Sequence, residues 1–115
     1  MELWNVTQQT QLASRLRIAV TFLQRLKGLL GTKFLPEGEA LLIRPCSSVH
    51  TLGMNYAIDV LFMTADDRVL KIAASMPPGR AAVAWGSSYV LELPPGIAAK
   101  TGTVVGDQLF IKKHE

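Results

Sequence analysis

The stretch IDVLFM (Ile58–Met63) decides the fold, because its branched and aromatic residues predict a strand within a run that is apolar except at one position. That position is Asp59. Side chains alternate along a strand, so the carboxylate shares a face with Leu61 and Met63 and lies opposite Val60. A buried carboxylate must find hydrogen-bond donors, or else its pKa rises. Asp59 is therefore either a structural cap or part of a functional site.

The donors expected for Asp59 come from the segment that precedes it, RPCSSVHTLGMNYA. They are the hydroxyl and backbone N–H groups of Ser47, Ser48 and Thr51, or the guanidinium of Arg44. This placement would gather polar side chains into one patch between Arg44 and Asp59. A ligand site there is expected to use Arg44, His50, Thr51 and Asp59.

Strand-like segments surround this run on both sides, each rich in branched or aromatic residues and bounded by turn-forming residues. Many short strands predict a sheet that folds over on itself or approaches a barrel. The predicted strands cover residues 3–6, 12–20, 40–43, 58–63, 68–74, 81–85, 89–93 and 107–112.

Helical spacing of apolar residues occurs in FLQRLKGLL, with Thr21 placed as the N-cap and Gly31 as the C-cap glycine. The segment IAAK (Ile97–Lys100) predicts one further helical turn, with Pro95 allowed at its start. The expected fold is α+β and predominantly β. It is a small barrel-like or folded antiparallel sheet with one amphipathic helix, about residues 21–30, packed against it. Residues 1–115 are expected to form a single domain.

Composition favours a globular chain, since 49% of the residues are hydrophobic and 18% are charged. Cys46 is the only cysteine in the sequence, so no intramolecular disulfide can form, and this fits a reducing compartment. No export signal or apolar segment of membrane-spanning length is visible. The expectation is a soluble, cytoplasmic protein.

Charge is unevenly distributed along the chain. No acidic residue lies between Glu2 and Glu37, whereas nine acidic and seven basic residues make up the charge elsewhere. A basic surface on the N-terminal third could meet nucleic acid, an anionic membrane surface or an acidic partner, or could be a solvated face with no partner. Its residues would be Arg15, Arg17, Arg25, Lys27 and Lys33.

Cys46, His50 and Asp59 are the residue types of a thiol nucleophile, its base and an orienting carboxylate. His50 is four positions after Cys46, about 13 Å away along a strand, which is too far for a hydrogen bond. A dyad would require the chain to curl there, and an inert buried cysteine is the alternative. No metal site is expected, because Cys46, His50 and His114 do not supply a structural zinc ligand set, and no cofactor is expected.

Four motifs then resemble one family in order and spacing: TFLQRLKGLLG (residues 21–31), IDVLFM, VLELPPG (90–96) and VGDQL (105–109). The chain resembles the domain-of-unknown-function 192 family, DUF192, also called UPF0127. The resemblance implies a small, mostly β domain with one packed helix and no established activity. The matching positions are Arg25, Gly28, Leu29, Asp59, Glu92, Gly96, Gly106 and Asp107.

The chain departs from that family's pattern just before Ile58. His50 stands where the family commonly has Trp, and Thr51, Gly53 and Ala57 replace Met, Asn and Pro. A role attached to the family's Trp-Met-x-Asn box therefore does not transfer to this chain.

The leading hypothesis is a non-enzymatic accessory module that binds a small ligand or a protein near Arg44–Asp59. The first alternative is a small thiol-dependent enzyme or hydrolase that uses Cys46, His50 and Asp59. The second alternative is nucleic-acid binding through the basic N-terminal face, which would depend strongly on salt.

Overall fold

The computed structural model describes residues 1–19 and 34–114 of the chain. Ten strands and one short helix lie in these residues. The elements are β1 (Glu2–Asn5), β2 (Thr10–Ala13), β3 (Arg15–Ala19), β4 (Glu39–Ile43), β5 (Ser48–His50), β6 (Ile58–Met63), β7 (Val69–Met76), β8 (Ala81–Val83), β9 (Tyr89–Leu93), α2 (Ile97–Lys100) and β10 (Leu109–Lys112).

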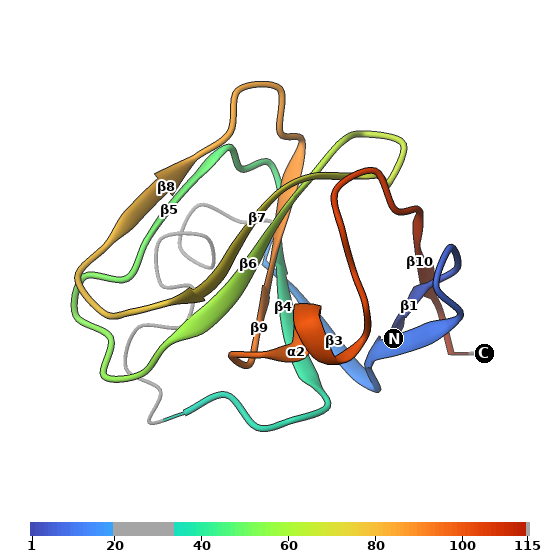
Figure 1. Ribbon diagram of the computed structural model, residues 1–115, viewed down its shortest axis with the longest axis horizontal. Coiled ribbons are helices and arrows are strands. Elements are labelled where there is room, and N and C mark those ends of the chain that lie inside the picture. The colour runs from blue at the N-terminus through green and yellow to red at the C-terminus, as the bar shows by residue number, and fades with distance from the viewer. Residues whose placement is uncertain (20–33, 115) are drawn as a thin grey trace.

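The strands form three sheets arranged around a central one. The central sheet has the order β3-β4-β9-β6-β7, a second sheet has the order β10-β1-β2, and β5 pairs with β8 in a two-stranded ribbon. In Figure 1 the ribbon and the three-stranded sheet lie on opposite sides of the central strands, with α2 near the lower ends of those strands. The N- and C-terminal strands are neighbours, since β1 pairs with β10.

The two central strands, β6 and β9, are buried along their whole length. Their side chains alternate between two apolar clusters, one on each face of the central sheet. Leu61 and Leu91 join β1, β2, β10 and α2 in the first cluster. Val60 and Val90 join the β5–β8 side in the second. A strand covered on both faces reads as a nearly continuous apolar run, as IDVLFM does.

The β-rich α+β fold class predicted from the sequence is confirmed, and the sheets of the described residues do not close into a barrel. The helical turn expected at Ile97–Lys100 is also present. The helix expected at residues 21–30 lies outside the described residues. Within the described part of the chain, no helix has the length and apolar character needed to cross a membrane.

The prediction of one continuous strand over residues 12–20 was wrong, because Ser14 divides that segment between two sheets. The backbone N–H groups of Ser14 and Arg15 both donate to the carbonyl oxygen of Gly38, each at 2.9 Å. Two successive donors directed at one acceptor bend the chain. Strand β3 then runs parallel to β4, whereas the other pairs of the central sheet are antiparallel.

Candidate functional site

Asp59 is fully buried and its carboxylate is satisfied by three backbone N–H groups. Oδ1 accepts from Ser75 at 2.7 Å and from Gly96 at 3.1 Å, and Oδ2 accepts from Ala98 at 2.8 Å. Gly96 is the N-cap residue of α2, so the carboxylate caps that helical turn from strand β6. The β6–β7 register shifts beside Asp59, which releases the N–H of Ser75 from the ladder.

The donors predicted for Asp59 from residues 44–51 were therefore wrong, although its predicted face was right. The carboxylate points to the side of the central sheet that α2 covers. Residues of the 44–57 segment pack on the other side of that sheet. Asp59 thus acts as a structural cap that joins β6, β7 and α2.

Thr51, which also belongs to the expected ligand patch, is buried, and its side chain forms hydrogen bonds within the protein. Its Oγ1 donates to the carbonyl oxygen of Pro77 at 2.6 Å and accepts from the N–H of Arg80 at 2.9 Å. Its backbone N–H donates to the Arg80 carbonyl oxygen at 2.8 Å. Thr51 therefore fixes the turn between β7 and β8.

Cys46 lies just before strand β5, and His50 is the last residue of that strand. The thiol of Cys46 donates to the carbonyl oxygen of Ser48 at 3.0 Å, and the side chain is half-buried. His50 ends β5, is exposed, and lies opposite Ala81 of β8. The hydrogen bond described for the thiol is thus to a backbone carbonyl oxygen.

Arg44 is exposed and stacks its guanidinium 4.5 Å from the centre of the Tyr89 ring. The hydroxyl of Tyr89 donates to Oδ1 of Asp67 at 2.6 Å. Burial, together with the neighbouring Asp67, raises the pKa of the Tyr89 phenol. Arg44 therefore covers one end of β9.

The predicted basic surface is only partly within the described residues. Arg15 and Arg17 are exposed on β3, and Arg15 lies 3.8 Å from Glu39. Arg25, Lys27 and Lys33 lie outside the described residues. Across the described residues, no group of three His, Cys, Asp or Glu side chains is placed to hold a metal ion.

Glu92 is a buried ionisable group that the sequence did not single out as a site residue. It lies on β9 opposite Leu41 of β4 and Val60 of β6, and only 4% of its surface is exposed. Its Oε1 has no hydrogen-bond partner in the structure described. Burial raises the pKa of this carboxyl to about 7.

The signal for Glu92 is the same one that drew attention to Asp59. In YVLEL (Tyr89–Leu93) a single carboxylate interrupts an apolar run, and alternation places Glu92 on the face of Val90. The two carboxylates are neighbours in register, since Asp59 pairs with Leu93 and Val60 pairs with Glu92. They point to opposite faces, and among the residues that the structure describes, N–H groups donate to Asp59 but none donates to Oε1 of Glu92.

The face that holds Glu92 is the one covered by the segment expected to carry the site. Val49, Met54 and the half-buried Tyr56 pack into the cluster on this side of the sheet. The chain from residue 51 to 57 leads into β6 at the end of the sheet where Glu92 lies, as the pairing of Val60 with Glu92 shows. The segment expected to carry the site and the buried Glu92 therefore lie on the same side of the central sheet, whereas Asp59 points to the other side.

Comparison with known proteins identifies similar chains of similar length. The sequence model of the family described as DUF192, uncharacterized ACR, matches residues 4–111. A UPF0127 protein of Pyrococcus furiosus is 30% identical over 110 residues, which cover 91% of this chain and 93% of the relative. A UPF0127 protein of Thermococcus sibiricus is 26% identical over 109 residues, covering 91% of this chain and 71% of the relative.

Two crystal structures share the fold. A protein of unknown function from Novosphingobium aromaticivorans has a TM-score of 0.82 and 25% identity, and the match covers 96% of this chain and 82% of that protein. A Sinorhizobium meliloti protein, described as a candidate transcription regulator, has a TM-score of 0.82 and 21% identity. That match covers 95% of this chain and 89% of the Sinorhizobium protein.

Proposed function

The chain belongs to the DUF192 family, and we propose that it is a ligand-binding module whose ligand offers a positively charged nitrogen to the carboxyl of Glu92. The observation that carries this proposal is that Oε1 of this nearly fully buried side chain has no hydrogen-bond partner among the residues described. Buried polar atoms in folded proteins almost always have partners, because an unmade hydrogen bond costs about 1–3 kcal/mol. A ligand would supply the missing donor.

The comparison with Asp59 supports this interpretation. Three backbone N–H groups satisfy that carboxylate, so burying it is no longer costly. Glu92, one strand away, gains no such compensation in the described structure. Environments of this kind are typical of binding and catalytic sites.

The chemistry of the surroundings limits the ligand. The positions opposite Glu92 are Leu41 and Val60, and Val90 precedes it on the same face. An apolar setting favours a ligand with a hydrocarbon body and one charged donor, such as a primary amine. The ammonium group would pair with the ionised carboxylate, and the hydrocarbon would contact the aliphatic side chains.

A binding role agrees better with the geometry than thiol chemistry does. Asp59, the carboxylate of the supposed Cys46–His50–Asp59 set, points to the opposite face of the central sheet and is engaged by α2 and Ser75. It therefore cannot orient an imidazole on the β5 side. The proposed site needs none of these three groups to react.

The test uses n-butylamine and its matched acid, n-butyrate, as probes in titrations followed by backbone amide chemical shifts. We expect butylamine, at a pH above 7, to shift the signals of residues 41, 60 and 92 in a saturable way. Butyrate is expected to leave these signals unchanged. Glu92→Gln is expected to abolish the response, whereas Glu39→Gln, at a half-exposed carboxylate on β4, retains it. Equal responses to both probes, or an unchanged response in Glu92→Gln, would contradict the proposal.

A further inference from the structure

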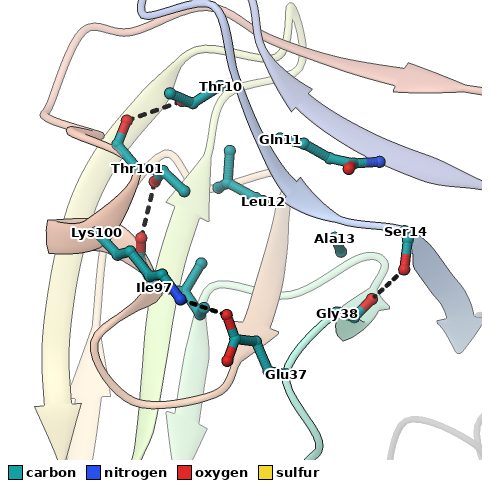
Figure 2. Close-up of a pocket in the computed structure, with 10 residues that line it drawn as sticks. All are labelled: Thr10, Gln11, Leu12, Ala13, Ser14, Glu37, Gly38, Ile97, Lys100 and Thr101. Carbon is teal, nitrogen blue, oxygen red and sulfur yellow. Dashed lines mark hydrogen bonds and ion pairs between the residues drawn. The ribbon is translucent and has the colours of Figure 1, made fainter.

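A separate hollow of about 350 Å³ lies between strand β2 and helix α2, away from the Glu92 face. Five consecutive residues, 10–14, line one wall (Figure 2). Side chains in a strand alternate between its two faces, so a wall of consecutive residues presents the edge of the backbone. Strand β2 is the last strand of its sheet in the described residues, and this edge therefore has N–H and C=O groups without a partner strand.

Both ends of this edge are closed by contacts to the opposite wall. Thr10 Oγ1 donates to the carbonyl oxygen of Thr101 at 2.8 Å, and the N–H of Ser14 donates to the carbonyl oxygen of Gly38 at 2.9 Å. The open span is residues 11–13, roughly 10 Å of strand. That span is too short for a typical added peptide strand, and the volume matches the lower end of small-molecule sites.

Opposite charges meet at the mouth of the hollow. The ammonium of Lys100 contacts Oε1 of Glu37, and Figure 2 shows these two side chains pointing toward each other. The exposed fractions of the two side chains are 65% and 69%. A pair this exposed contributes only about 0–1 kcal/mol, so a ligand can replace it at little cost.

The inner surface of the hollow is apolar at Leu12 and Ile97, which are both buried members of the cluster that α2 covers. A ligand that fits must therefore carry adjacent positive and negative groups at one end and an aliphatic group at the other. An α-amino acid has this arrangement, because its ammonium and carboxylate are attached to the same carbon.

We propose that this hollow binds a free α-amino acid with an aliphatic side chain. Its carboxylate pairs with Lys100 and its ammonium pairs with Glu37. The Lys100–Glu37 ion pair is thereby replaced by two ion pairs between the protein and the ligand. The side chain contacts Leu12 and Ile97, and the free edge of β2 offers hydrogen bonds to the charged groups.

L-leucine is the probe, compared with 4-methylpentanoate, which lacks the ammonium, and with isopentylamine, which lacks the carboxylate. Backbone amide shifts of the whole chain follow each titration. We expect leucine to shift residues 10–14 and 97–101 in a saturable way, and each analogue to bind there at least about tenfold more weakly. A response of isopentylamine at residues 41, 60 and 92 belongs to the Glu92 site and is distinguished by its location.

Lys100→Gln and Glu37→Gln each remove one charge, and Lys113→Gln is the matched control at an exposed lysine outside the hollow. The first two variants are expected to bind leucine at least about tenfold more weakly, and the control as the wild type does. Circular dichroism checks that the variants fold, and the analogue comparison on the wild-type chain needs no variant. An absent leucine response at residues 10–14, or equal binding of leucine and either analogue there, would overturn the proposal.

Discussion

At the scale of single residues, Asp59 and Glu92 show how the surroundings of a carboxylate decide its role. Each interrupts a fully buried central strand, and the two are adjacent in register. Asp59 faces the N-terminus of α2 and the bulged part of β7, where three N–H groups converge on it. Glu92 faces aliphatic side chains, and its Oε1 stays without a partner in the described residues.

Asp59→Asn should destabilise the fold strongly. The side-chain NH₂ group of an asparagine would face a backbone N–H group that now donates to the carboxylate, so that hydrogen bond is lost. The remaining backbone N–H groups would donate to a neutral amide oxygen instead of a charged carboxylate. We expect a loss of about 3 kcal/mol in the free energy of unfolding, measured by urea denaturation. Glu37→Gln, at an exposed ion pair, is the control and should change stability by less than about 1 kcal/mol. A loss for Asp59→Asn no larger than the control's would contradict the capping role.

The raised pKa of Glu92 predicts that this residue makes stability decrease as pH rises. The folded-state pKa is raised to about 7 from a reference value of 4.5, so the folded protein holds this proton more tightly than the unfolded chain does. The contribution of Glu92 to stability should therefore be highest below pH 4.5, fall as pH rises from 4.5 to 7, and level off above 7. The fall attributable to this group is at most about 3 kcal/mol. Urea denaturation across this range measures it, and in Glu92→Gln the fall should disappear; an identical fall in the variant would assign it to other groups.

The sequence located the unusual residues better than it identified their partners. The apolar runs made Asp59 conspicuous, and alternation correctly assigned its face. Its donors come from residues 75, 96 and 98, far away in the sequence, so no local pattern could name them. Glu92 gave the same signal in YVLEL, and only the structure shows that its face offers no donor in the described residues.

At the scale of elements, connections between strands set the geometry of both proposed sites. Ser14 lies between β2 and β3, and at that bend the N–H groups of Ser14 and Arg15 both donate to the carbonyl oxygen of Gly38. The bend leaves the outer edge of β2 free beside α2 and so creates the hollow. On the other side, the 51–57 segment is held by Thr51 before it enters β6.

Gly38→Ala tests the importance of this bend. Gly38 has φ +91°, which a side chain disfavours, and an added Cβ would lie 3.2 Å from the Ser14 hydroxyl oxygen. We expect a loss of about 1–3 kcal/mol in the free energy of unfolding, measured by thermal denaturation. Gly79→Ala is the matched control, because its φ is +79° but an added Cβ there meets nothing within 4 Å. A smaller loss at Gly38 than at Gly79 would show that the contact with Ser14 does not matter.

At the scale of the whole molecule, the chain is closed by contacts between its two ends. Strand β1 pairs with β10, and Leu3 and Leu109 share one buried cluster with the central strands. We infer that residues 1–115 form one cooperative domain. The β-rich class and most strand positions were predictable from alternation and turn residues, but strand β5 and the break at Ser14 were not predicted. The parallel pairing of β3 with β4 was not predictable, because it depends on contacts between segments that are distant in the sequence.

Single-tryptophan variants test this cooperativity. Trp4 lies in β1, and Trp85 follows β8 on the opposite side of the central sheet. Trp4→Phe leaves the fluorescence of Trp85 as the probe, and Trp85→Phe leaves that of Trp4. For each variant, urea unfolding followed by fluorescence should coincide with unfolding of the same variant followed by circular dichroism, as one cooperative transition requires. If the fluorescence and circular-dichroism transitions of either variant did not coincide, the chain would contain two independently folding parts.

Titration of the side-chain carboxyl carbon of Glu92 in ¹³C NMR measures whether this buried carboxyl has a raised pKa and binds a cationic ligand. The missing signal in Glu92→Gln assigns the resonance. We expect a midpoint near pH 7 in the free protein and a lower midpoint when butylamine is bound, because the amine stabilises the ionised form. A midpoint near the reference value of 4.5 that butylamine leaves unchanged would contradict this expectation.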